Sequence, residues 1–207
     1  MKPNFRTVIA AAGILFTISA YAGAQDRRET TDPNEFLAKH EAELEQAGQS
    51  RKLYLLLAMA PAALAANKIE KARSYADQLF AMGEAMQAMP GFGPSMLADS
   101  THVGHMVLGQ IAFLNGDIKG AKENLVAAGK VPGSPVLNSF GPEMLLAKEL
   151  IGKGERETVL AYLDLCGSFW QNERGRLESW KQTINEGQEP DFGANNGRVF
   201  RIWQFVK

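Results

Sequence analysis

Residues 113–125 read FLNGDIKGAKENL, and residues 64–76, 49 positions earlier, read LAANKIEKARSYA. Both stretches contain the end of an apolar segment, a short polar turn, and a second segment with small residues at matching positions. A weaker third copy has its turn at Gly154. Recurrence of one pattern of this length indicates a structural unit used several times, and the spacing of apolar residues on both sides of the turn predicts a helical hairpin.

Small or apolar residues follow each turn in pairs that are seven positions apart. These pairs are Ala72 and Leu79, Ala121 and Ala128, and Val159 and Cys166. Small side chains let the two helices of a hairpin approach closely, so that neighbouring hairpins can stack and share one core. We therefore expect an all-α fold of about three stacked hairpins with flanking N- and C-terminal helices. A helical bundle without repeats is the alternative.

Helix signals extend along most of the chain, and strand signals are almost absent. Asp32 followed by Pro33 is a typical helix start, and glycines such as Gly48 and Gly116 mark helix ends. The apolar run 53–66 contains Pro61 and is too short to be a membrane span. The expected helices cover residues 32–47, 51–66, 69–88, 97–115, 118–128, 142–152, 155–166 and 171–186.

The middle copy resembles a tetratricopeptide repeat. The residues that carry the resemblance are Leu108, Gly109, Ala112, Gly116, Asp117, Ala121, Leu125, Ala128 and Pro132. The resemblance covers about 51–166, with copy spacings of 49 and 38 residues where that family has 34. The position at which the family has an aromatic residue is occupied here by Leu56, His105 and Glu143.

In tetratricopeptide-like arrays, the first helices of successive hairpins line a groove that binds a protein or peptide. The resemblance therefore implies a non-catalytic binding protein. Carried over residue by residue, the groove positions are Tyr54, Leu57, Met106, Gln110, Met144 and Lys148. Tyrosine and methionine are adaptable contact residues, and Gln110 and Lys148 are suited to a peptide backbone or carboxylate.

A second resemblance is to exported bacterial proteins of unassigned function. The residues that carry it are His102, His105, Leu108-Gly109, Gly116-Asp117, Gly133-Ser134-Pro135, Ser139-Phe140-Gly141-Pro142, Cys166, Phe169-Trp170 and the segment 190–195. The similarity supports the fold and export, and it implies no activity.

The N-terminus predicts export. Lys2 and Arg6 precede an apolar run from Val8 to Ala20, and small residues follow, which is the pattern of a signal peptide cleaved after Ala22. The sequence then divides into a signal peptide (1–22), a flexible linker (23–31), a helical-repeat domain (32–187) and a C-terminal tail (188–207). We expect a bacterial periplasmic or secreted protein; a retained N-terminal anchor helix and a cleavage site two residues later are the alternatives.

Charge excludes some classes of partner. Without residues 1–22 the chain has 20 Lys and Arg against 23 Asp and Glu, so it presents no basic surface for nucleic acid or an anionic membrane. The single cysteine, Cys166, cannot form an internal disulfide, and its position in the hairpin pattern predicts burial and inertness. We expect no cofactor.

His102 and His105 are the best candidates for chemistry. Positions three apart on a helix share one face, as two metal ligands would, with Asp99 or His40 as a candidate third ligand. A metal-binding protein or enzyme that uses His102 and His105 is therefore one alternative function. An architectural component of an envelope complex is another.

The tail 198–207 reads RVFRIWQFVK, with polar residues at every third position. This period fits a short helix or an extended segment packed along one face. We expect the tail to dock on the open end of the array; contact with a partner or a membrane surface is the alternative.

Overall fold

The computed structural model describes residues 31–90 and 93–206, and this part of the chain is helical without any strand. The predicted signal peptide and most of the predicted linker lie outside the described residues. The all-α prediction is confirmed. The helices are α1 (Pro33–Gln46), α2 (Gln49–Ala65), α3 (Ile69–Met86), α4 (Gly93–Leu114), α5 (Ile118–Gly129), α6 (Pro135–Phe140), α7 (Leu145–Gly152), α8 (Arg156–Cys166), α9 (Arg176–Asn185) and the 3₁₀ helices η1 (Gly193–Asn195) and η2 (Val199–Phe205).

Side-chain caps explain several helix starts. Asp32 accepts hydrogen bonds from the backbone N–H groups of Asn34 and Glu35 at the beginning of α1. Asp117 does the same for Gly120 at the beginning of α5, at 2.9 Å. These bonds satisfy N–H groups that have no partner within the helix. The short polar turns that the sequence marks therefore begin helices as expected.

The prediction missed one short helix and placed several helix boundaries differently. Helix α6 is not among the helices expected from the sequence; Ser134 caps it by accepting the Leu137 N–H group at 3.0 Å, and Pro135 occupies its first turn. Helix α9 begins later than predicted, because Arg174 and Gly175 have positive φ values of 55° and 79° that interrupt a helix. Helix α4 begins four residues earlier than predicted, at Gly93.

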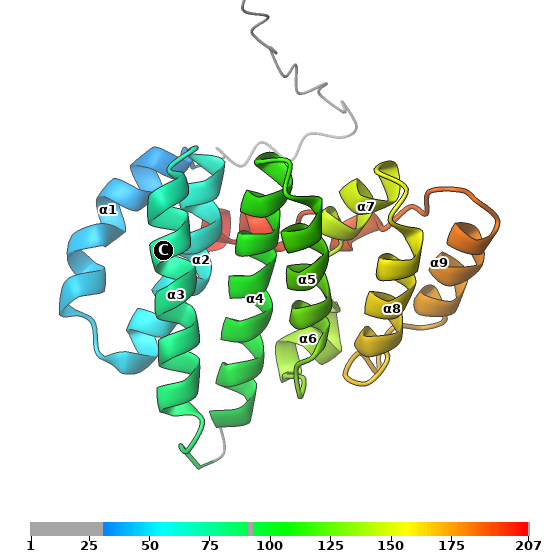
Figure 1. The fold of residues 1–207 in the computed structure, drawn as a ribbon. Coiled ribbons are helices and arrows are strands. Elements are labelled where there is room, and N and C mark those ends of the chain that lie inside the picture. Colours follow the sequence, from blue (N-terminus) through cyan, green and yellow to red (C-terminus); the bar gives the residue numbers. More distant parts are fainter. Residues whose placement is uncertain (1–30, 91–92, 207) are drawn as a thin grey trace, which may run out of the picture.

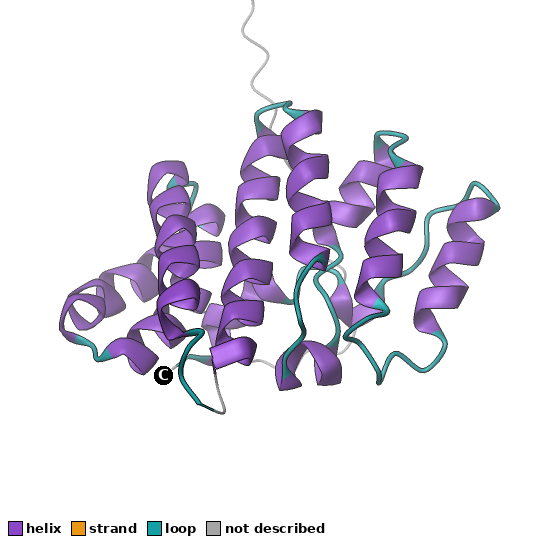
Figure 2. Ribbon diagram, turned by 60° about the horizontal axis from the view of Figure 1, so that its bottom comes forward, coloured by secondary structure: helices purple, strands orange, loops and turns teal. Residues whose placement is uncertain are grey.

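The helices stack side by side along the molecule (Figures 1 and 2). Helix α3 packs on both α2 and α4, α4 on α5, α5 on α8, and α8 on α9. Helix α1 covers α2 at one end, and α7 contacts α4, α5 and α8. The three consecutive helix pairs α2–α3, α4–α5 and α7–α8 thus correspond to the segments in which the sequence pattern recurs.

The paired positions after the three turns are all buried. Ala72, Leu79, Ala121, Ala128, Val159 and Cys166 have no exposed surface. Gly109 shows why a small residue is needed in the preceding helix: a Cβ atom there would lie 2.4 Å from a methyl group of Leu146 in α7. A larger residue at this position would require the end of the Leu146 side chain to shift.

The core is divided into two apolar clusters that share α4. One contains residues of α1 to α4 together with Val199 and Trp203 of the tail, and the other contains residues of α4 to α9. The helices of the two described ranges include none with the length and apolarity needed to cross a membrane.

The C-terminal tail folds back along the molecule. In Figure 1 it runs behind the helices from the α9 end toward α2, and η2 packs against α2. The expectation of docking at the open end of the array is wrong as to place, because Val199 and Trp203 of η2 belong to the core cluster of α1 to α4. The period of three in its sequence matches the three residues per turn of a 3₁₀ helix.

Candidate functional site

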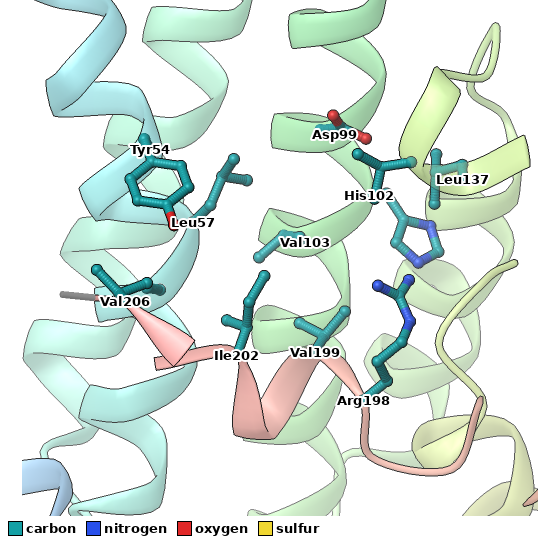
Figure 3. Close-up of a pocket in the computed structure, with 12 residues that line it drawn as sticks. Tyr54, Leu57, Asp99, His102, Val103, Leu137, Arg198, Val199, Ile202 and Val206 are labelled. Carbon is teal, nitrogen blue, oxygen red and sulfur yellow. The ribbon is translucent and has the colours of Figure 1, made fainter. Parts of the chain in front are cut away.

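A pocket of about 210 Å³ lies between α2, α4, α6 and η2. Figure 3 shows its aliphatic walls, which include Leu57 of α2, Val103 of α4 and Ile202 of the tail. Tyr54, 47% exposed, also lines this pocket. The space is therefore suited to an apolar group that enters from solvent past an aromatic ring.

The other end of the pocket is polar. Asp99 accepts a hydrogen bond from the Ser134 hydroxyl at 2.5 Å, and burial raises the pKa of its carboxyl group. Arg198 donates from Nη2 to the Gly141 carbonyl oxygen at 2.8 Å. Its Nε is buried and has no partner among the described residues. Burial lowers the pKa of Arg198, while the charges of Glu143 and Asp99 raise it.

His102 lines the same end of the pocket and is neutral. Burial lowers its pKa to about 4. Its Nε2 accepts the Glu143 N–H group at 3.1 Å, so the proton resides on Nδ1, which donates to the Ala128 carbonyl oxygen at 2.9 Å. The ring thus joins α4 to the end of α5 and to the segment before α7, and both of its nitrogens are occupied.

Glu143, which is fully buried, connects this site to the tail. Its carboxylate accepts four backbone N–H groups at 2.6–2.9 Å, from Met144, Leu145, Gly197 and Val199. Burial raises the pKa of the carboxyl group, and the backbone hydrogen bonds oppose that shift. The Glu143 side chain therefore stabilises the first turn of α7 and holds the start of η2 in place.

The structure brings together only two of the six residues predicted to line a groove. Tyr54 and Leu57 line the pocket. Met106 and Met144 are fully buried in the core, so the prediction that they contact a partner is wrong for this structure. For Met106 the reason is that α2, α3, α5 and α7 all pack on α4 and cover this part of the helix.

The remaining two predicted groove residues are engaged within the chain. Gln110 is 4% exposed and donates to Glu149 at 2.7 Å. Lys148 is half-buried and forms an ion pair with Glu189, at the beginning of the C-terminal tail, at 3.3 Å.

The two histidines of the predicted pair do not converge on one point. The Nδ1 atom of His105 is bonded to Oδ1 of Asn124 at 2.9 Å, and its ring packs on Phe80. Across residues 31–90 and 93–206, no three His, Cys, Asp or Glu side chains are grouped so that they could hold a metal ion. Cys166 is buried as predicted, and burial raises the pKa of its thiol.

Sequence reasoning missed Glu143, Ser134 and Arg198 as members of a site. One signal was present: Glu143 occupies a position where the repeat pattern has an aromatic residue, and a charge in a core position requires partners. Arg198 gave no comparable signal, because its neighbours at the pocket come from segments far away in the sequence.

Comparisons with models of protein families, with curated proteins and with solved structures gave no match for this chain. Its function is therefore inferred from the pocket and from the helices that form it.

Proposed function

We propose that this chain is a non-catalytic protein- or peptide-binding protein built from tetratricopeptide-like hairpins. The observation that carries the proposal is the pocket of about 210 Å³ on α2 and α4, the first helices of two successive hairpins. Tetratricopeptide-like arrays bind their partners on these helices. The pocket receives an apolar anchor side chain of the partner, and Tyr54 covers part of that side chain.

The chemistry of the pocket favours binding over catalysis. Its walls are largely aliphatic, and His102, Asp99 and Arg198 each form an internal hydrogen bond that holds the helices and the tail together. Both ring nitrogens of His102 are already hydrogen-bonded, so this side chain has no free lone pair or proton for a substrate. Aliphatic walls with a partly exposed tyrosine at the edge are the features of a pocket for an apolar anchor.

A pair of variants tests this proposal. Val136 lines the pocket and is 42% exposed, so Val136→Trp places an indole ring in the space without disturbing the core. Leu114→Trp adds the same ring at an exposed position at the other end of α4. Peptides selected from a random library on the wild-type chain are expected to bind Val136→Trp at least tenfold more weakly and Leu114→Trp unchanged. Equal affinity for all three proteins would remove the pocket from the proposal.

Export is the second part of the proposal, and it is supported by the charged and apolar pattern of residues 1–22. Mass spectrometry of the chain after expression in a bacterium tests it directly. The expected product begins at Gly23 and is recovered from the periplasm or the medium. A chain that keeps residues 1–22 and remains with the membrane would instead favour an anchor helix.

Each alternative function predicts a different experimental observation. An enzyme or metal protein at His102 and His105 receives no support from the geometry, because both nitrogens of His102 are hydrogen-bonded within the chain. An architectural component of an envelope complex would be recovered with its partners in fixed stoichiometry after crosslinking in cells. A peptide-binding protein would instead be recovered with partners in variable amounts.

A further inference from the structure

The tail consists of two parts that are held in different ways. Residues 195–199 are fixed by hydrogen bonds to the segment before α7. The Asn195 side chain donates to the carbonyl oxygens of Phe140 and Pro142, and the N–H groups of Gly197 and Val199 donate to Glu143. Buried hydrogen bonds to a carboxylate are strong, so this part is a firm anchor.

Residues 200–206 are held by apolar contacts instead. Trp203 is 5% exposed and belongs to the core cluster of α1 to α4, yet its indole N–H is buried without a partner among the described residues. The backbone hydrogen bonds of Arg201 and Val206 stay within the tail. A buried donor without an acceptor lowers stability, and 3₁₀ hydrogen bonds have poor geometry.

The same segment covers α2 without filling the space beneath it. Ile202 and Val206 form one wall of the pocket, and Leu57 of α2 is part of another (Figure 3). Phe205 points away from the core and is 66% exposed. An empty volume beneath Ile202 and Val206 is the packing expected of a segment that can be exchanged for another.

We propose that residues 200–206 are an intramolecular occupant of the binding surface on α2, and that a partner segment of the same chemistry replaces them. The tail itself gives the pattern of that partner: a short helical turn with aliphatic and tryptophan side chains at the spacing of Ile202, Trp203 and Val206. Residues 195–199 remain in place as the hinge. This inference rests on the proposed peptide-binding function and names its partner class and its regulation.

A tethered occupant competes strongly with a free peptide. A segment linked by a few residues acts at an effective concentration on the order of millimolar, so a free peptide of equal affinity binds the wild-type chain weakly. Replacing Trp203, the largest apolar side chain of the tethered segment, with alanine should lower this competition. The hydrogen bonds to Glu143 should keep the tail attached.

A fluorescein-labelled peptide with the sequence of residues 197–206 tests the inference on the full chain. We expect it to bind Trp203→Ala at least tenfold more tightly than the wild type. Phe205→Ala is the matched control, because that side chain is exposed, and its affinity should equal the wild-type value. The same peptide with alanine in place of its tryptophan should not bind. Equal binding to all three proteins, or none to a folded Trp203→Ala, would overturn the inference.

Hydrogen exchange of the wild-type chain provides a readout that needs no variant. Amides of residues 200–206 are expected to exchange at least 100-fold faster than those of Gly197 and Val199. Equal protection would show that the segment is part of the rigid core and would overturn the inference. If Trp203→Ala does not fold, Ile202→Ala replaces it in the peptide titration.

The outcome of the tail-peptide titration can be distinguished from the outcome of the Val136→Trp experiment that tests the proposed function. If library peptides depend on the pocket at Val136 and the tail peptide does not bind, only the present inference fails. If library peptides are indifferent to Val136→Trp, the proposed function itself fails.

Discussion

The carboxylate of Glu143 accepts the backbone N–H group of Val199 at 2.7 Å across a sequence separation of 56 residues. Glu143 also accepts the N–H groups of Met144 and Leu145 at the start of α7. One buried side chain thus joins the last hairpin to the tail. The apolar half of the tail can therefore be held loosely while its beginning stays in place.

Replacing this carboxylate should loosen the tail. In Glu143→Gln, an amide NH₂ group takes the place of one acceptor oxygen, and at least one buried backbone N–H group loses its partner. We expect the free energy of unfolding to fall by about 2 kcal/mol, the range for a hydrogen bond to a charged group. Urea denaturation measures this loss. Exposed Glu45→Gln in α1 is the control and should remain within about 0.5 kcal/mol of the wild type.

His102 should make the protein sensitive to acid. Burial lowers its pKa in the folded state to about 4, below the ordinary value of 6.5. Between these values the unfolded chain binds a proton and the folded chain does not, so this contribution to stability is complete above pH 6.5 and is lost as the pH falls toward 4. From pH 7 to pH 5 the loss is about 2 kcal/mol.

Urea denaturation at pH 7 and pH 5 checks this prediction by comparison with His102→Gln, which has no titrating ring. The variant should be less stable at pH 7 but should lose less stability on acidification than the wild type. The raised pKa values of Asp99 and Glu143 act in the opposite direction and are common to both proteins. Equal losses in the two proteins would contradict a neutral, buried His102.

Alanine substitutions at two glycines distinguish the destabilisation caused by backbone strain from that caused by a steric clash. Gly154 has a φ of 86° with open space where a Cβ atom would lie, whereas Gly141 has a φ of 78° with Trp170 2.5 Å from that position. Gly154→Ala should destabilise the protein by about 1 kcal/mol through strain alone. Gly141→Ala adds a steric clash to a backbone conformation that is almost exclusive to glycine, and should cost about 3 kcal/mol or more. Thermal melting of both variants measures the difference, and similar costs would show that the contact with Trp170 relaxes.

Cys166 should be unreactive in the folded protein. It is fully buried, and burial raises the pKa of its thiol, so little thiolate is present. With 5,5′-dithiobis(2-nitrobenzoate) at pH 8, labelling should be at least about 100-fold slower than in urea, because the reagent must wait for the helices to open. Fast labelling of the native chain would mean that α8 opens readily.

The class of fold and most helix positions could be predicted because their causes are local. Asp32 and Asp117 cap helices with backbone groups only two or three residues away, and Ala72, Ala121 and Val159 recur at one offset from their turns. Helix α6 was missed although its cap is local too, because a helix of six residues is too short to show helical periodicity.

The candidate site was predictable only in part. Tyr54 and Leu57, which the repeat resemblance assigns to a binding groove, line the pocket in the structure, and their contact with a partner stays a prediction. The same rule failed for Met106 and Met144, since it does not take into account the other helices that cover them. His102 was identified as a candidate metal ligand or catalytic residue. In the structure its hydrogen bonds to Ala128 and Glu143 give it a structural role.

The sequence by itself determined that the chain forms helices, where most of them begin and end, and which of their faces are apolar. These properties depend on capping and on periodicity over a few residues. Only the tertiary structure decided that the tail turns back onto α2 and that Glu143 holds it there. Such contacts join residues more than 50 positions apart, and their free energy depends on burial and partner geometry that no local pattern contains.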